Sequence, residues 1–314
     1  DQFISGAYVG PSGVYLGTGS VLNTGNGLDL IAGTGANGLD DPTSTVWVSA
    51  GNGGDGIRNR GTILTGNGSD AAIGINPEFG PLIRGQGGNG ANGTSSSLRN
   101  GSDGGDGGAG IRNLGTGTIK TANGGDLLLG IGGNGGDGGN GYVGDSSGSN
   151  RNGGNGGDGG DGIHNDTGGK IETGNGDDAI IGIGGSAGAG GAAGNNGSSG
   201  AAGRQGFGIY NSGTIDMGRG DDVIDASRGG FGGNGTVKMG LGNDVVKGFG
   251  SGTFIADKGF DQLIFNSGTY NVAAGSSTGS FNITNGAIPG VTMVVSGFES
   301  LNGQAFATGA FVVV

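Results

Sequence analysis

The chain of 314 residues contains no cysteine, only 5 prolines, and charged residues at 13%. Without cysteine it can have neither a disulfide framework nor thiolate metal ligands. It has no run of about 18 apolar residues, so we expect no membrane span. The 14 Lys and Arg residues are outnumbered by 26 Asp and Glu residues. This balance argues against nucleic acid as a partner, because phosphate binding needs clustered cations.

Glycine is the residue that the chain has in excess, with 89 copies. Glycine has poor helix propensity and loses much conformational freedom when it is ordered, so a helical globular enzyme is excluded. The apolar residues gather in short runs of Ile, Val and Leu, which argues against a disordered chain. A fold that uses short strands and many turns remains.

One phrase recurs along the chain and first appears in full at residues 56–70, as Gly-Ile-Arg-Asn-Arg-Gly-Thr-Ile-Leu-Thr-Gly-Asn-Gly-Ser-Asp. Further copies, some shorter or degenerate, occupy 19–29, 110–126, 162–178, 208–222, 235–244 and 252–261. The seven units align on the aspartate that closes each phrase: Asp29, Asp70, Asp126, Asp178, Asp222, Asp244 and Asp261.

Two apolar positions accompany each phrase. Three residues before the Gly-x-Gly turn stand Leu22, Ile63, Ile119, Ile171, Ile215, Val237 and Phe254. Two residues after the aspartate stand Ile31, Ala72, Leu128, Ile180, Ile224, Val246 and Leu263. Short β-branched runs around such a turn are typical of strand–turn–strand units, and stacked units bury what one unit cannot. We predict an all-β, right-handed parallel β-solenoid of about seven rungs over residues 18–265, one rung for each unit.

An asparagine column also follows the repeat, at Asn59, Asn113, Asn165 and Asn211. Stacked asparagines can hydrogen-bond along the axis, so this column is predicted to be structural. The residue just before it varies, as Arg58, Arg112, His164 or Tyr210. Such variation favours a solvent-facing position for His164 over a catalytic role, which would need a partner acid or base in a concave site.

Glycine-rich insertions are predicted at about 33–55, 76–109, 132–161 and 184–207. They repeat every three residues, as Gly-Gly-Asn or Gly-Gly-Asp, and three is the period of the polyproline-II conformation. They resemble the polyglycine-II bundles of glycine-rich antifreeze proteins and some phage tail adhesins. We predict arms that run out and back and stack at about 4.8 Å. A flexible glycine-rich loop is the alternative.

The turns read Gly-Asn-Gly-Leu-Asp at 25–29, Gly-Asn-Gly-Asp-Asp at 174–178 and Gly-Leu-Gly-Asn-Asp at 240–244. They resemble the RTX family of secreted repeat proteins, which bind Ca²⁺ between the turns of a parallel β-roll. The resemblance implies Ca²⁺ at the seven closing aspartates, together with turn carbonyls. RTX repeats are nine residues long, whereas these turns recur every 17 to 56 residues. The alternative is that each aspartate accepts N–H groups of its own turn without a metal.

Repulsion between stacked carboxylates favours the metal interpretation. Charges about 5 Å apart repel one another unless a counter-ion lies between them. We therefore expect Ca²⁺ as the cofactor of the column, with metal-free turn capping as the competing hypothesis.

The two ends differ from the repeats. Residues 1–17 are predicted to dock on another subunit. Residues 266–314 carry several aromatic residues and apolar runs, and they resemble the C-terminal β cap of RTX-like solenoids. A cap is also expected physically, because an open solenoid end invites edge-to-edge addition.

The sequence has no Ser/His/Asp set, phosphate-binding loop or His/Cys cluster, so we predict that it is not an enzyme. The pairs Asp177/Asp178 and Asp221/Asp222 would serve a polysaccharide-active solenoid, but neighbours in a strand point to opposite faces. We expect an extracellular structural protein, a head-to-tail homopolymer of a surface filament, sheath or matrix that contacts polysaccharide. The alternative is an adhesin or an ice-binding protein, the latter through the column Thr24, Thr65, Thr121 and Thr173.

Overall fold

The computed structural model describes residues 2–6, 12–25, 29–39, 50–65, 82–95, 100–143 and 150–314. In these residues every regular element is a β-strand, and the strands form three sheets, named A, B and C here. None of the described residues belongs to a helix that is long and apolar enough to cross a membrane.

Sheet A has ten strands, in the order β1 (Gln2–Gly6), β4 (Asp29–Thr34), β7 (Leu82–Gln86), β10 (Leu127–Ile131), β13 (Ala179–Ile183), β16 (Val223–Arg228), β19 (Val245–Lys247), β21 (Gln262–Ile264), β25 (Ser300–Leu301) and β26 (Gln304–Ala305). Sheet B has six: β2 (Val14–Leu16), β5 (Ile57–Asn59), β8 (Ile111–Asn113), β11 (Ile163–Asn165), β14 (Ile209–Asn211) and β17 (Phe231–Gly232).

Sheet C has eleven strands, in the order β3 (Val21–Asn23), β6 (Thr62–Leu64), β9 (Thr118–Lys120), β12 (Lys170–Glu172), β15 (Thr214–Asp216), β18 (Thr236–Leu241), β20 (Gly252–Lys258), β24 (Thr292–Ser296), β23 (Ser280–Asn285), β22 (Gly268–Ala274) and β27 (Gly309–Val313).

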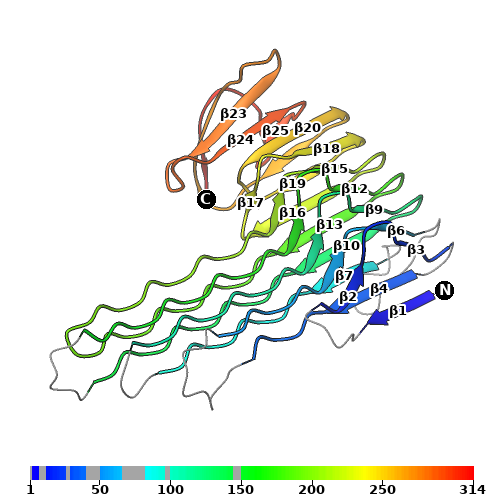
Figure 1. Cartoon of the computed structure of the whole chain (residues 1–314). Coiled ribbons are helices and arrows are strands. Elements are labelled where there is room, and N and C mark those ends of the chain that lie inside the picture. Colours follow the sequence, from blue (N-terminus) through cyan, green and yellow to red (C-terminus); the bar gives the residue numbers. More distant parts are fainter. Residues whose placement is uncertain are drawn as a thin grey trace.

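A coil of the chain contributes one strand to sheet B, the next to sheet C and the third to sheet A, as β11, β12 and β13 do. Like strands of successive coils pair in parallel and in register. Ile163 of β11, for example, lies opposite Ile111 of β8 and Ile209 of β14. The predicted parallel β-solenoid is therefore confirmed, and Figure 1 shows its strands stacked along one axis.

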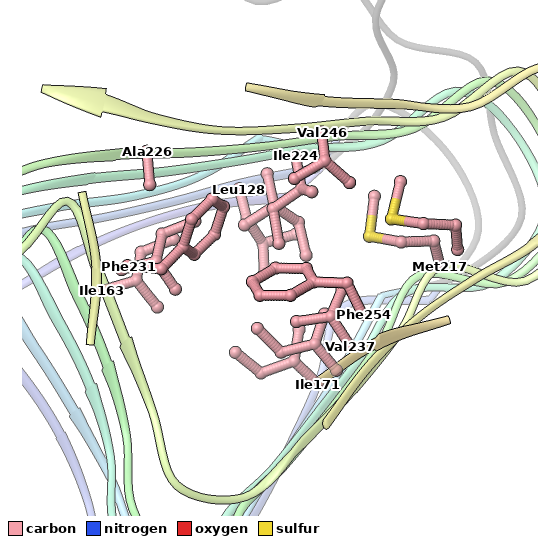
Figure 2. Close-up of a cluster of buried hydrophobic side chains, with 14 of the residues drawn as sticks. Leu128, Ile163, Ile171, Met217, Ile224, Ala226, Phe231, Val237, Val246 and Phe254 are labelled. Atoms are coloured by element: carbon pink, nitrogen blue, oxygen red, sulfur yellow. The ribbon is translucent and has the colours of Figure 1, made fainter. Parts of the chain in front are cut away.

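The interior of the solenoid is the predicted ladder of aliphatic residues. The consecutive register partners in sheet C, all fully buried, are Ile63, Ile119, Ile171 and Ile215. Figure 2 shows side chains of the three sheets meeting in one core, with Leu128 from sheet A facing Ile171 from sheet C. Towards the C-terminal end the rings of Phe231 and Phe254 pack edge to face, 4.8 Å between centroids. Like side chains thus stack on like from coil to coil.

Glycine-rich arms leave the solenoid between a strand of sheet A and the next strand of sheet B. They occupy the described parts of segments 35–56, 87–110, 132–162 and 184–208. Figure 1 shows them running side by side, away from the strands and on one side of the stack. Each arm has an outgoing half and a returning half, and halves of one kind stack from coil to coil.

Each of the three residues in a Gly-Gly-x triplet finds a partner for its backbone N–H. Gly156, a first glycine, donates to a carbonyl of the following arm at 2.8 Å, and Gly157, a second glycine, donates to the outgoing half of its own arm at 2.8 Å. The third residue, Asp158, donates to Oδ1 of Asp106 in the preceding arm at 2.8 Å. The arms are therefore ordered by hydrogen bonds between coils, as the polyglycine-II interpretation predicts.

The second coil departs from the prediction. The sequence repeat put Ala72 in the interior ladder of sheet A and assigned 76–109 to an insertion, and Ala72 lies outside the described residues. The ladder position is held by Ile83 of β7, paired with Ile31 and Leu128 of the neighbouring coils. The second arm consequently begins after β7, later than predicted.

The two ends of the solenoid are built differently. At the C-terminal end β24 and β25 still pair in parallel with β20 and β21, and β23, β22 and β27 then add an antiparallel sheet. At the other end β1 pairs with β4 and β2 pairs with β5. Residues 2–6 and 14–16, which the sequence assigned to a docking segment, thus belong to the chain's own sheets.

The close packing of the arms predicts a steric penalty for any side chain at an inward glycine. A Cβ atom on Gly157 would lie 2.0 Å from the carbonyl oxygen of Gly105 in the preceding arm. We expect Gly157→Ala to lower the free energy of unfolding by about 1–3 kcal/mol, as overpacking does, measured by thermal or denaturant unfolding. Gly286→Ala is the control, because nothing lies within 4 Å of its Cβ position. An equal, small effect of both substitutions would contradict the packed bundle.

Candidate functional site

The closing aspartates form a buried ladder at the turn between sheets C and A. Every described member is at most 1% exposed, namely Asp126, Asp178, Asp222, Asp244 and Asp261. The backbone N–H of each donates to Oδ1 of the next, at 2.8 to 2.9 Å. The last N–H, that of Asp261, donates to Oε2 of Glu299 at 2.7 Å. The carboxyl groups of Asp178, Asp222, Asp244 and Asp261 therefore each satisfy a backbone donor of the preceding coil, not of their own turn.

Two of the seven predicted members are not part of this description. Asp70 lies outside the described residues. Asp29 begins β4, but its side chain is not among those described. The described ladder therefore covers the five C-terminal positions.

The second carboxyl oxygen is the unusual part of the ladder. Oδ2 of Asp222, Asp244 and Asp261 is buried and makes no hydrogen bond. Burial disfavours the charged form of a carboxyl group, and it raises the pKa of Asp178 to about 6, that of Asp222 to about 8 and that of Asp244 to about 6. The charges of Asp178 and Asp244, which flank Asp222 in the ladder, contribute to the rise of its pKa.

The resemblance to RTX proteins can be tested against the oxygens of these turns. A calcium ion takes six to eight oxygen ligands. The carbonyls of Ala122, Gly174 and Gly218 each accept an N–H group from the next coil, at 3.0 to 3.1 Å. Among the described residues, no three Asp, Glu or His side chains lie close enough to hold a metal ion. The described turns show no cluster of three such side chains, and calcium binding stays a prediction that chelation would test.

The threonine column next to the turns is also interior. Thr24, Thr65, Thr121 and Thr173 are at most 6% exposed. Thr121 Oγ1 donates to the carbonyl of Thr173 at 2.6 Å, and Thr173 Oγ1 donates to that of Met217 at 2.6 Å. The interpretation of this column as an ice-contact face is therefore wrong, because its side chains are buried. The hydroxyl groups of Thr121 and Thr173 also bond between coils.

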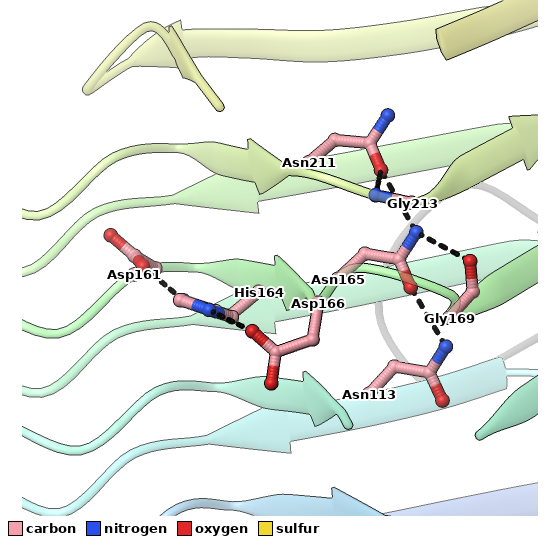
Figure 3. A network of polar contacts seen from close by, with 8 residues as sticks. All are labelled: Asn113, Asp161, His164, Asn165, Asp166, Gly169, Asn211 and Gly213. Atoms are coloured by element: carbon pink, nitrogen blue, oxygen red, sulfur yellow. Dashed lines mark hydrogen bonds and ion pairs between the residues drawn. The ribbon is translucent and has the colours of Figure 1, made fainter. Parts of the chain in front are cut away.

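The asparagine column is a second ladder, at the corner between sheets B and C, and its predicted structural role is confirmed. Nδ2 of Asn59, Asn113 and Asn165 donates to Oδ1 of the asparagine in the next coil, each at 2.8 Å. Figure 3 shows the members from Asn113 to Asn211, with the neighbouring glycines at the corner. A Cβ on Gly169 would lie 2.4 Å from the Oδ1 atom of Asn165, so the ladder requires glycine there.

His164 is half-buried, not solvent-facing as the sequence suggested. Its Nδ1 lies 2.7 Å from Oδ2 of Asp161 and its Nε2 lies 3.0 Å from Oδ1 of Asp166 (Figure 3). The ring stacks on Tyr210, 4.6 Å between centroids. Burial lowers the pKa of His164, but the hydrogen bond and charge of Asp161 outweigh it, so the pKa is raised overall. The sequence signal for this cluster is the pair of aspartates that flank His164, three residues before it and two residues after it.

This cluster joins the third arm to the solenoid. Asp161 is the last x residue of the arm, and Asp166 follows β11. The coil of Arg58 has a similar pair, since its guanidinium lies 3.5 Å from Asp55, also three residues earlier. The arrangement is a set of ion pairs within one chain.

The fold and these ladders define the chain as a β-solenoid repeat protein with stacked polyglycine arms. Comparison of the chain with protein-family models, with curated proteins and with solved structures finds no match.

The raised pKa of Asp222 predicts a pH-dependent stability. Its folded-state pKa of about 8 exceeds the ordinary value of 3.8, so the folded state binds more protons between these values. The free energy of unfolding should then fall as pH rises from 3.8 to about 8. Asp222→Asn should flatten this dependence, measured by denaturant unfolding across that range. His164 also has a raised pKa, so it too makes the free energy of unfolding fall as pH rises. The measurement is therefore repeated on the double variant Asp222→Asn, His164→Gln. An unchanged slope in both would contradict the assignment.

Proposed function

We propose that the protein is an extracellular structural protein, a self-associating subunit of a surface filament, sheath or matrix. The observation that carries the proposal is the continuity of its three sheets. Successive coils pair in parallel over the described length, with register shifts only in β13–β16 and β18–β20. Polyglycine arms widen the stack on one side. Stacked repeats of this kind form an extended body in which each coil contacts only its neighbours.

The contact between subunits would be made by edge strands. At the first coil, β1, β2 and β3 are the outer strands of sheets A, B and C. Tyr15 and Val21 in these strands are 56% and 64% exposed. An unpaired edge is a template for another strand, so it supports head-to-tail association at this end.

The ladders favour a structural role over catalysis. The buried aspartates serve backbone N–H groups, and His164 serves two ion pairs within its own coil. The acidic surface suits cations or neutral polysaccharide better than nucleic acid. An adhesin that binds matrix polysaccharide is the second candidate, supported by the rows of exposed Asn and Asp side chains on the arms.

Self-association tests the proposal directly. We expect purified protein to form elongated assemblies in electron microscopy and to show a mass that rises with concentration in light scattering. The measurements are made with Ca²⁺ and with a chelator, so that a requirement for the metal is seen. A chain that stays monomeric at high concentration in both conditions would contradict the proposal.

A matched pair of variants locates the contact. The N–H of Val14 donates to the chain's own Gly56, at 2.9 Å, so by alternation the N–H of Tyr15 points to the outer edge of β2. Tyr15→Pro removes that outer donor without removing a bond of the chain's own sheet, and it should weaken association. Tyr15→Thr keeps the donor and should not.

A further inference from the structure

In the first three arms the third residue of a triplet has a recurring task, to which Ala109 is an exception. Its side-chain oxygen accepts the backbone N–H of the matching residue in the next arm. In the returning halves Asp158 donates its N–H to Asp106 Oδ1 at 2.8 Å and Arg204 donates to Asp158 Oδ1 at 2.7 Å. In the outgoing halves Asn134 and Asp137 accept in the same way, at 2.9 and 2.8 Å. An arm needs Asn or Asp here only if another arm follows it.

The first glycine of a returning triplet has a second task. A Cβ atom on Gly153, Gly156 or Gly159 would lie 2.1 Å from a carbonyl oxygen in the outgoing half of the following arm. The same clash, at 1.8 to 2.0 Å, occurs in the second arm at Gly101, Gly104 and Gly107. Glycine is therefore required here only if another arm packs on this side.

The fourth arm, 184–208, lacks these glycines in its returning half and keeps a side-chain oxygen acceptor only at Ser186 and Ser198. The positions of the oxygen acceptors hold Ser186, Ala189, Ala192, Ser198, Ala201, Arg204 and Phe207, which are identified by the N–H groups that they donate to the third arm. The first-glycine positions of its returning half hold Ser199, Ala202 and Gln205, and all three are exposed.

The backbone of the fourth arm is nevertheless open on this side. In the described part of the chain, no hydrogen bond is made by the N–H groups of Ser199, Ala202 or Gln205. Their counterparts Gly153, Gly156 and Gly159 donate to carbonyls of the fourth arm at 2.8 to 2.9 Å. The backbone of the fourth arm could therefore bond to a further layer, and only its side chains stand in the way.

The chain itself stops making arms at this point. Ile183 and Ile209 are separated by the whole fourth arm, whereas their register partners in the next coil, Arg228 and Phe231, are separated by two residues. Those two, Gly229 and Gly230, have φ of +115° and +75° and turn the chain at once. A Cβ on Gly229 would lie 2.6 Å from the carbonyl oxygen of Gly206, so this turn covers only the base of the arm.

The outgoing half of the first arm shows the same device on the other side. One residue of this half, Ala36, is equivalent to Gly88, Gly133 and Gly185 of the later arms. Ala36 has a side chain where those arms have glycine. In later arms a Cβ at this position would lie 1.9 to 2.0 Å from a carbonyl oxygen of the arm before. Leu39, three residues on, is 84% exposed.

We propose that the fourth arm is a built-in terminator of the polyglycine bundle, which accepts the third arm and rejects any further layer, whether from this chain or from a second copy. The missing acceptors leave an incoming third residue without a partner for its N–H, and the added Cβ atoms prevent the approach of its carbonyls. Self-association then has to use surfaces other than the end of the bundle. This inference holds whether or not the protein forms filaments.

The test grafts a fifth arm onto the chain. A copy of residues 132–162, which joins β10 to β11, replaces Gly229 and Gly230 between β16 and β17, the same position in the coil. The graft is made on the native fourth arm and on an opened one. The opened arm carries Ser199→Gly, Ala202→Gly and Gln205→Gly together with Ala189→Asp, Ala201→Asn and Arg204→Asp. All proteins also carry Tyr15→Pro, so that association at the solenoid edge does not contribute.

The readout is amide hydrogen exchange of the grafted residues, followed by mass spectrometry. We expect exchange in the graft to be about 10-fold slower or more on the opened arm than on the native arm, since hydrogen-bonded amides are protected. Equal exchange on both arms, fast or slow, overturns the proposal. Variants with only the glycine changes or only the acceptor changes repeat the comparison with a smaller disturbance. Unchanged protection of the original third arm verifies the fold in each case.

Discussion

A backbone N–H that points along the axis of a solenoid has to find an acceptor on the neighbouring coil, because a buried donor without one is costly. In the strands the acceptor is a carbonyl of the paired strand. At the turns and on the arms of this protein the acceptor is often a short side chain: aspartate at the turn, and asparagine or aspartate on the arms. One interaction, repeated at the spacing of the coils, therefore orders segments that are neither helix nor sheet.

This interaction also accounts for much of the acidity of the chain. The column on the returning halves that contains Asn52 continues as Asp106 and Asp158, and the one that contains Asp103 continues as Asn155. Asn and Asp alternate freely because the position requires a side-chain oxygen at a fixed distance and not a charge. The excess of acidic residues thus follows from the packing, and it does not by itself imply bound cations.

The sequence predicted the solenoid because its strongest constraint, one aliphatic residue per strand at equivalent positions, is a local pattern. Ile63, Ile119 and Ile171 could be aligned before any contact was known. The asparagine ladder was predictable for the same reason. The second coil was misassigned because Asp70-Ala-Ala-Ile-Gly-Ile imitates the strand that starts after Asp126, while the paired strand is β7. Periodicity alone does not decide between two segments that both fit one position.

The candidate site was predicted only in part. The column of aspartates could be predicted from the repeat. Their burial and their bonds to the preceding coil could not, because both depend on how the coils stack and not on any single turn. Whether the side chains of Thr121 and Thr173 point inward or outward likewise depends on how the coils close and stack. His164 was misjudged because a variable column was equated with an exposed one, whereas Asp161 and Asp166 cover it on both sides.

The central claim is that hydrogen bonds between coils hold the arms as firmly as they hold the strands. Native-state amide hydrogen exchange of the unmodified chain measures this most directly, residue by residue over 132–143 and 150–162. The account predicts that these glycine amides are protected to nearly the same degree as those of β10 and β11. Exchange of the arm amides at the rate of an unstructured chain, with the strands still protected, would contradict it.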